Sequence, residues 1–248
     1  MRSSELLDSL EGVPRRFLGE YPTPLAQLER LSHDLGRSIY VKRDDALGPA
    51  GGGNKTRKLE YLLADAIEKG EEKIVTVGGP QSNHARLTAA AARLLGLQPH
   101  LLIFGDKPKK AVGNLLLDEL VGAKLHFIPP GPIAEGACTF EELDAHVRRF
   151  AADRVGDHYY IPLGGSNGLG SVGYVRAAVE LEEQAKDAGV ADAWIVVATG
   201  SGGTLAGLLA GLKTIGSSLR LIGIDVARIW KNYPELVARI ANDALGLL

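Results

Sequence analysis

Hydrophobic residues along the chain follow two kinds of spacing. Short, nearly continuous apolar runs bounded by turn residues predict strands at 38–43, 73–77, 100–104, 124–128, 158–163, 194–198 and 220–226. Between these runs, apolar residues recur every three or four positions, as at Leu59, Leu62, Leu63, Ala66 and Ile67, which predicts helices. Strands that alternate with helices of this length predict parallel βαβ units and an α/β fold.

Several segments carry more specific expectations. Residues 1–24 predict an irregular arm, because the closely spaced prolines Pro22 and Pro24 force an extended backbone at its end. The two last strands, 194–198 and 220–226, are apolar enough to predict burial on both faces. Thr139 with Glu142 predicts a capping box at the start of a helix.

A glycine-rich loop precedes the first predicted helix. The sequence Gly51-Gly52-Gly53 leaves its backbone open to a ligand, and Asn54 is a good N-cap for the helix that Gly70 ends. Lys55 then stands at the positive end of a helix dipole, which disfavours its ammonium form. Its amine is therefore a candidate for attack on a carbonyl.

Two other interpretations of Lys55 stay open. Many lysines near glycines are solvated surface residues. A phosphate-binding loop of the form G-x-x-x-x-G-K-[ST] needs the lysine directly after the second glycine. Gly48 and Gly53 have the right spacing, but Asn54 separates Gly53 from Lys55, so a nucleoside triphosphate site has little support.

A second glycine loop follows strand 194–198. The loop Gly200-Ser201-Gly202-Gly203-Thr204 combines free backbone N–H groups, two hydroxyls and a helix N-terminus, which predicts an anion site. The alternatives are a tight turn without a ligand and a dinucleotide fingerprint. In the second case Gly200 and Gly202 fit and Asp225 could bind a ribose, but Leu205 replaces the third glycine.

A cluster of hydrogen-bonding side chains opens another helix, at Gln81, Ser82, Asn83 and His84. One such residue suffices for an N-cap, so four in a row favour a small ligand that carries a carboxylate. Loops that follow parallel strands gather at one edge of a sheet, which predicts that these loops converge on one crevice. A lysine in a glycine loop and a separate phosphate cup suggest pyridoxal phosphate as cofactor.

Composition excludes several classes of protein. The chain has 248 residues with a formal net charge of −2, 45% hydrophobic and 23% charged residues, so no basic excess predicts nucleic-acid binding. No apolar run is long enough for a membrane span or a signal peptide. One cysteine, Cys138, permits no intrachain disulfide, which predicts a cytoplasmic protein and an inert thiol. The six histidines show no metal-binding spacing, so no metal is expected.

The motifs together resemble the family of D-cysteine desulfhydrase and 1-aminocyclopropane-1-carboxylate (ACC) deaminase, from about Tyr21 to the end. The resemblance rests on residues 42–45, 52–58, 81–84, 164–167 and 200–204. It implies the tryptophan-synthase β-like fold, fold type II of the pyridoxal phosphate enzymes. The expected organisation is a smaller inserted α/β domain at 57–162 and a larger cofactor-binding domain from 1–56 and 163–248.

The resemblance also implies roles for single residues. Lys55 matches the lysine that binds the cofactor covalently, Asn83 a contact to its phenolic oxygen, and Gly200–Thr204 the phosphate cup. Ser82 matches a catalytic hydroxyl beside the substrate, with Gln81 and His84 near the substrate carboxylate. ACC deaminases usually carry glutamine where this chain has His84, which favours the desulfhydrase.

The implied reaction is αβ-elimination from a small amino acid, with D-cysteine giving pyruvate, hydrogen sulfide and ammonia in a homodimeric enzyme. ACC deamination is the alternative. Family members are noticeably longer, and nothing after Asp225 matches their substrate-facing tyrosine or the polar group at the pyridine nitrogen. The larger domain is therefore expected to be shortened, with poor turnover or a catalytically impaired remnant as a further alternative and apolar surface exposed beside the last strand.

Overall fold

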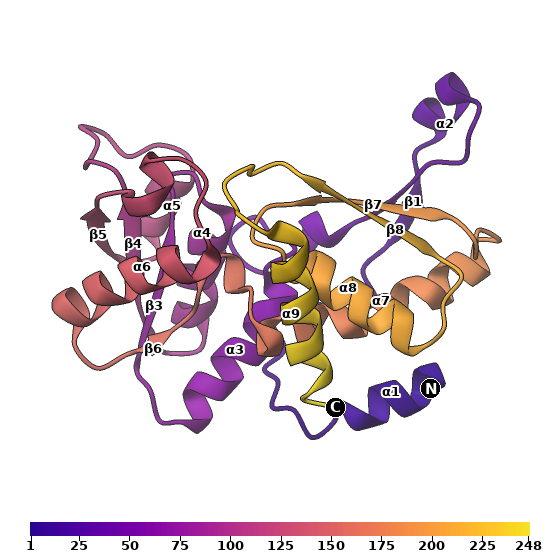
Figure 1. Cartoon of the computed structure of the whole chain (residues 1–248), viewed down its shortest axis with the longest axis horizontal. Helices are drawn as coiled ribbons and strands as arrows, with labels where there is room; N and C mark the ends of the chain where they lie inside the picture. Colours follow the sequence, from indigo (N-terminus) through magenta and orange to yellow (C-terminus); the bar gives the residue numbers. More distant parts are fainter.

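The computed structural model describes residues 1–248, and its strands form three sheets (Figure 1). The largest sheet is parallel throughout, in the order β5-β4-β3-β6, with β3 (Lys73–Gly78), β4 (Gln98–Phe104), β5 (Lys124–Ile128) and β6 (Tyr159–Tyr160). A parallel pair consists of β7 (Trp194–Thr199) and β8 (Arg220–Asp225), and an antiparallel pair of β1 (Leu25–Gln27) and β2 (Tyr40–Lys42). The predicted α/β fold with parallel sheets is confirmed.

Helices α4, α5, α6 and α8 connect strands within the parallel sheets. The helices are α1 (Ser3–Ser9), α2 (Glu29–Leu35), α3 (Thr56–Glu68), α4 (Asn83–Leu94), α5 (Asn114–Leu120), α6 (Phe140–Val155), α7 (Gly168–Asp187), α8 (Gly203–Thr214) and α9 (Tyr233–Leu245). The capping box of α6 is confirmed, because Thr139 Oγ1 accepts from the Glu142 N–H at 3.1 Å and the Glu142 carboxylate accepts from the Thr139 N–H at 2.8 Å. None of the helices combines the length and the apolar character needed to cross a bilayer.

Residues 1–24 are not wholly irregular, so that prediction was wrong. They contain α1, whose Leu6 is fully buried together with Leu10 just after the helix. Both leucines belong to the main core, which α7, α8 and α9 also line. Helix α1 is short, so burial of these leucines rather than intrinsic propensity holds it in place.

The prediction that β7 and β8 are buried on both faces was also wrong. Exposure alternates along β7, where Trp194 is 57% and Val196 65% exposed. In a parallel pair, residues in register share a face, so Val196 lies beside Ile222, and Ile224 follows two residues later on the same face. Helix α8 covers only the other face, where a side chain at Gly223 would collide with Leu205. Apolar surface is thus exposed on this two-stranded sheet.

Close helix packing fixes the two glycine loops relative to each other. A Cβ atom at Gly173 of α7 would lie 2.1 Å from the carbonyl oxygen of Arg57 on α3. A Cβ atom at Gly207 of α8 would lie 2.3 Å from the carbonyl oxygen of Ser171 on α7. Because only glycine fits at both positions, α3 and α8 pack directly on the backbone of α7. The strands of the four-stranded sheet all fall within 57–162, while the predicted domain boundaries themselves stay a prediction.

Candidate active site

Lys55 occupies the N-cap position of α3, since the helix begins at Thr56. The prediction that Asn54 is the N-cap was therefore wrong by one residue. The Lys55 side chain is half-buried, and burial lowers the pKa of its ammonium to about 8. Its one hydrogen bond runs to Asn54 Oδ1 at 3.2 Å. A larger share of this amine is thus unprotonated near neutral pH than in an ordinary lysine.

Asn54 connects the lysine loop to the predicted anion cup. While its Oδ1 accepts from Lys55 Nζ, its Nδ2 donates to Thr204 Oγ1 at 3.2 Å. The two residues stand 150 positions apart in the chain, so the fold brings the two glycine loops together as the sequence predicts for Lys55 and Thr204. A cavity of about 320 Å³ lies beside Asn54 and Thr204, also lined by Tyr174 and Ala198.

The Gly200–Thr204 loop leads into the first turn of α8. Its Gly203 N–H donates to Ser166 Oγ at 3.1 Å, and Ser166 Oγ lies 2.8 Å from Ser201 Oγ. The N–H groups of Gly202, Thr204 and Leu205 make no hydrogen bond within the protein. Free N–H groups at a helix N-terminus are suited to an anion.

Lys58 is a further lysine of this region, and the sequence predicts no role for it. It is buried, and its Nζ donates to the Gly164 carbonyl and to Ser166 Oγ, both at 3.1 Å. Burial, and then the charge of Lys55, hold the pKa of Lys58 well below its usual value. Its spacing of three residues from Lys55 on a helix was the available indication that both share a face.

Gln81 and Asn83 bind to the start of α5 rather than to the glycine loops. Gln81 Oε1 accepts from the Asn114 N–H at 3.0 Å, and Asn83 Oδ1 accepts from Asn114 Nδ2 at 2.9 Å. Ser82 is the N-cap of α4 and accepts from the Ala85 N–H at 3.1 Å. The capping interpretation of this cluster thus holds for Ser82. Contacts of Gln81, Ser82 and Asn83 with a ligand stay predictions.

Arg86 joins the start of α4 to the lysine loop, another role that the sequence did not reveal. Its guanidinium donates to the carbonyl oxygens of Ala50 and Gly52, the latter at 3.0 Å, and to Asn83 Oδ1 at 3.4 Å. Its position one helical turn after Ser82 was the only local indication. The backbone of the lysine loop and the side chain of Asn83 are therefore held by one residue.

His84 is buried and turned away from solvent. Its Nε2 lies 2.8 Å from Thr76 Oγ1, and its Nδ1 has no partner in the protein. Burial, and then the charges of Lys55 and Lys58, hold the pKa of His84 well below its usual value. The imidazole is therefore neutral at pH 7, and it shares one electrostatic environment with the two lysines.

The residues at this site fit pyridoxal phosphate. A partly exposed amine with a lowered pKa can bind its carbonyl, and the unpaired N–H groups at the start of α8 can bind its phosphate. Asn54 holds the amine and the cup in one site. A dinucleotide at the Gly200–Thr204 loop would leave Lys55 without a role.

Comparison with known proteins agrees with this fit. The profile of the family described as "Pyridoxal-phosphate dependent enzyme" matches residues 16–242. The chain belongs to the pyridoxal-phosphate dependent enzymes. The predicted cofactor, pyridoxal phosphate, and the prediction that the protein is an enzyme of this class are confirmed.

Individual members of the family cover most of the chain. It is 41% identical to a D-cysteine desulfhydrase of Klebsiella pneumoniae, over 94% of this chain and 70% of that protein. It is 39% identical to a provisionally named ACC deaminase of Pyrococcus horikoshii, over 96% of this chain and 71% of that protein. The solved structure of an ACC deaminase homologue matches with a TM-score of 0.83 and 37% identity, over 98% of this chain and 72% of that one. The predicted resemblance and fold type are confirmed, and the chain spans about 70% of its relatives' length.

Proposed function

We propose that this enzyme eliminates the β-substituent of a small amino acid, with D-cysteine as substrate and pyruvate, hydrogen sulfide and ammonia as products. The observation that carries the proposal is the bridge through Asn54, which holds the Lys55 amine next to the cup at Thr204. Elimination from an amino acid requires such an amine and a fixed cofactor.

Each residue of the site has a role in this proposal. Lys55 Nζ, once the substrate amine has displaced it, takes the proton from the substrate Cα. Pyridoxal phosphate supplies a ring that accepts the electrons left at that carbon. Ser82 places a catalytic hydroxyl beside the substrate, Gln81 binds near the substrate carboxylate, and Asn83 contacts the phenolic oxygen of the cofactor. The N–H groups of the Gly200–Thr204 loop hold the phosphate.

ACC deamination is the second candidate, because relatives with either name are about equally similar to this chain. His84 in place of a second glutamine favours D-cysteine. Pyruvate release from D-cysteine, measured beside 2-oxobutanoate release from ACC, separates the two. L-Cysteine tests the configuration, and Lys55→Ala is the control for background chemistry. Release of 2-oxobutanoate alone would overturn the proposed substrate.

The exposed apolar face of β7 and β8 supports a homodimer as part of the proposal. Trp194, Val196, Ile224 and Val226 are each about half exposed or more, which is unusual for neighbouring apolar side chains. A second copy of the chain would cover them. Light scattering should give the mass of a dimer, and Val196→Lys should lower it to that of a monomer. An unchanged mass in the variant would remove this face from the interface.

The same exposed face favours a third candidate, a chain that binds the cofactor but turns over poorly. Protein loaded with pyridoxal phosphate that releases neither product would support it.

A cytoplasmic location also belongs to the proposal, on the ground that Cys138 is the single cysteine and is buried. Fractionation of the cells that make the protein tests this location.

A further inference from the structure

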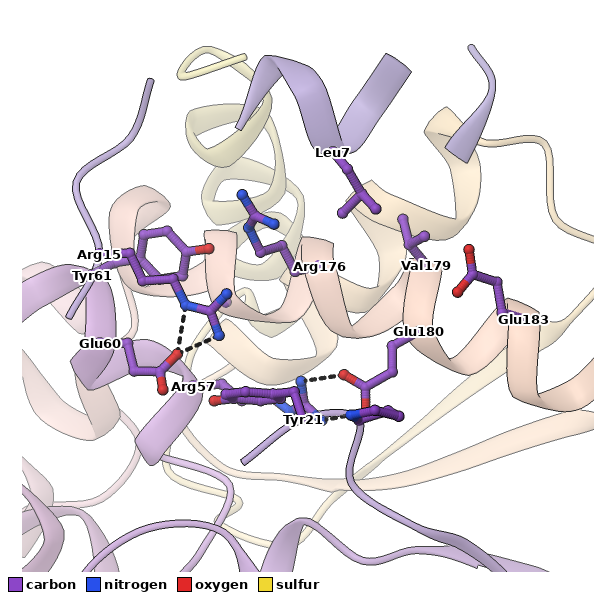
Figure 2. Close-up of a pocket in the computed structure, with 12 residues that line it drawn as sticks. Leu7, Arg15, Tyr21, Arg57, Glu60, Tyr61, Arg176, Val179, Glu180 and Glu183 are labelled. Carbon is purple, nitrogen blue, oxygen red and sulfur yellow. Dashed lines mark hydrogen bonds and ion pairs between the residues drawn. The ribbon is translucent and has the colours of Figure 1, made fainter. Parts of the chain in front are cut away.

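A second cavity, of about 290 Å³, lies between the N-terminal segment and helices α3 and α7 (Figure 2). Helix α3 contributes Arg57, Glu60 and Tyr61 to it, whereas Lys55 and Lys58 lie on a different face of that helix. The cavity is therefore separate from the candidate active site. None of the roles assigned to pyridoxal phosphate or substrate uses it.

Unpaired polar atoms gather at this cavity. Of the ten buried side-chain polar atoms without a partner in the protein, three belong to its lining: Tyr21 Oη, Tyr61 Oη and Arg176 Nε. Tyr61 is fully buried, and its hydroxyl end points toward Arg176 (Figure 2). Arg176 faces the Tyr61 oxygen, which can only accept from it, so the Tyr61 proton still lacks an acceptor. An unpaired buried donor costs free energy, which favours an acceptor bound at this cavity.

The three arginine side chains that line the cavity differ in how many of their nitrogens already donate hydrogen bonds. Arg57 is saturated, because its three nitrogens donate to Asp44, Glu180 and Thr23. Arg15 donates through Nε and Nη2 to Glu60, at 2.7 Å each, which leaves its Nη1 free. Arg176 donates only through Nη2, to Glu11, which leaves Nε and Nη1 free. The free donors thus belong to two guanidinium groups and two phenols.

We propose that this cavity is a binding site for a small carboxylate, held by Arg176, Arg15 and the Tyr61 hydroxyl. Guanidinium groups bind carboxylates in a fixed, directional geometry. A phosphate dianion fits less well, because Glu60, Glu180 and Glu183 also line the cavity and repel a second negative charge. Glu183 makes no ion pair or hydrogen bond with its side chain, so it can bind the ammonium group of an amino acid whose carboxylate occupies the site.

The test uses the cofactor-loaded protein and isothermal titration with acetate, L-alanine and inorganic phosphate. Tyr61→Phe removes one donor without changing the shape of the side chain, and it should weaken carboxylate binding roughly tenfold or more. Tyr159→Phe is the matched control, because its hydroxyl donates to Asp65 outside the cavity and its loss should leave binding unchanged. Arg176→Gln should weaken binding as well.

The same titrations distinguish an amino acid from a simple organic acid as the ligand. Tighter binding of L-alanine than of acetate, lost in Glu183→Gln, identifies an amino acid, and equal binding identifies a simple organic acid. Ser82→Ala should leave this binding intact, since it changes only the candidate active site. The proposal is wrong if neither carboxylate binds at tens of millimolar, if phosphate binds more tightly than acetate, or if Tyr61→Phe binds like wild type.

Discussion

Thr76 Oγ1 lies 2.8 Å from His84 Nε2 and also 2.8 Å from the carbonyl oxygen of Ile161. A threonine hydroxyl has one proton, and a carbonyl oxygen can only accept, so this proton goes to Ile161. His84 must then donate from Nε2, which leaves Nδ1 as an acceptor. The low pKa of His84 opposes a second proton at Nδ1. His84 in this state holds α4 against β3, and its predicted contact with a substrate carboxylate would require that proton.

Thr76→Val should lower the free energy of unfolding by about 1–3 kcal/mol, because it leaves both His84 Nε2 and the Ile161 carbonyl without a partner. Urea denaturation followed by circular dichroism measures this. The control is Thr88→Val, another fully buried threonine, whose hydroxyl donates only to the His84 carbonyl within α4. Equal losses in both variants would argue against the bridge that Thr76 makes.

The covalent attachment of pyridoxal phosphate should follow the titration of Lys55. Burial lowers the pKa of its ammonium to about 8, and only the neutral amine attacks a carbonyl. The attachment rate, followed by absorbance in the protein freed of cofactor, should rise with pH up to about 8 and level off above it. An amine with the ordinary lysine pKa would instead give a rate still rising at pH 9. In Lys55→Ala, borohydride treatment should leave no pyridoxal phosphate covalently bound to the protein.

The same lowered pKa has a consequence for stability. Below pH 8 the folded protein holds a charged lysine in a poorly solvated position. Between pH 8 and about 10.4 the unfolded state binds more protons there than the folded state, so stability rises with pH across this window. Lys55→Met should therefore be more stable than wild type at pH 7, and the difference should shrink toward pH 10. Thermal unfolding without cofactor checks this, and a difference independent of pH would contradict it.

The anion cup should depend on both its hydroxyl and its glycines. Thr204→Val should weaken cofactor binding by about 1.5–3 kcal/mol, the scale of a hydrogen bond to a charged group. Gly203→Ala should weaken it further, because its Cβ atom would lie 2.6 Å from Ser166 Oγ and 2.7 Å from Lys58 Nζ. Cofactor dissociation constants measure both effects. Gly12→Ala is the control for a glycine replacement as such, because Gly12, like Gly203, has no positive φ and its Cβ atom would meet open space.

Two neighbouring aspartates form one buried and one exposed ion pair, so the contributions of the two pairs to stability can be compared. Asp44 is buried and accepts from Arg57 at 2.8 and 2.9 Å, whereas Asp45 is exposed and accepts from Arg43. Burial alone would raise the pKa of Asp44, but the hydrogen bonds and charge of Arg57 outweigh it and lower that pKa. Arg57→Met should cost about 3–5 kcal/mol of stability, because it leaves the buried Asp44 carboxylate without a cation, although Glu180 keeps its ion pair with Lys42. Arg43→Met should cost less than about 1 kcal/mol.

Urea denaturation of Arg57→Met and Arg43→Met measures the free energy of unfolding that each variant loses. Similar small losses would show that the Asp44–Arg57 pair contributes no more than a surface pair. The loss in Arg57→Met should also be smaller at low pH, where Asp44 and Glu180 become protonated and need no partner. Burial raises and Arg57 lowers the pKa of both acids, and in wild type Arg57 outweighs burial. Without Arg57 both pKa values rise, so the loss should shrink as the pH falls from the higher pKa values of the variant to the lowered ones of wild type.

Local sequence patterns were sufficient to predict the order of strands and helices from residue 38 onward, the family and the lysine in its glycine loop, whereas α1, β1 and α2 were missed. These features depend on local spacing and on residues that stand close together, such as Gly51–Lys55 and the capping box at Thr139. Local rules also have a limit, since the N-cap of α3 is Lys55, and the Asn54 side chain donates to Thr204 instead of capping the helix. Thr204 lies 150 positions away.

Which faces are buried and which polar groups find partners depends on contacts between distant segments of the chain. The apolar runs of β7 and β8 indicate strands, but their exposure depends on what packs against each face, and α7 and α8 pack against one face only. Likewise, no sequence pattern brings Tyr21, Tyr61 and Arg176 to one cavity, because they come from three different segments. Local spacing specifies hydrogen bonding and periodicity within a segment, whereas burial and pairing arise from contacts between segments far apart in the chain.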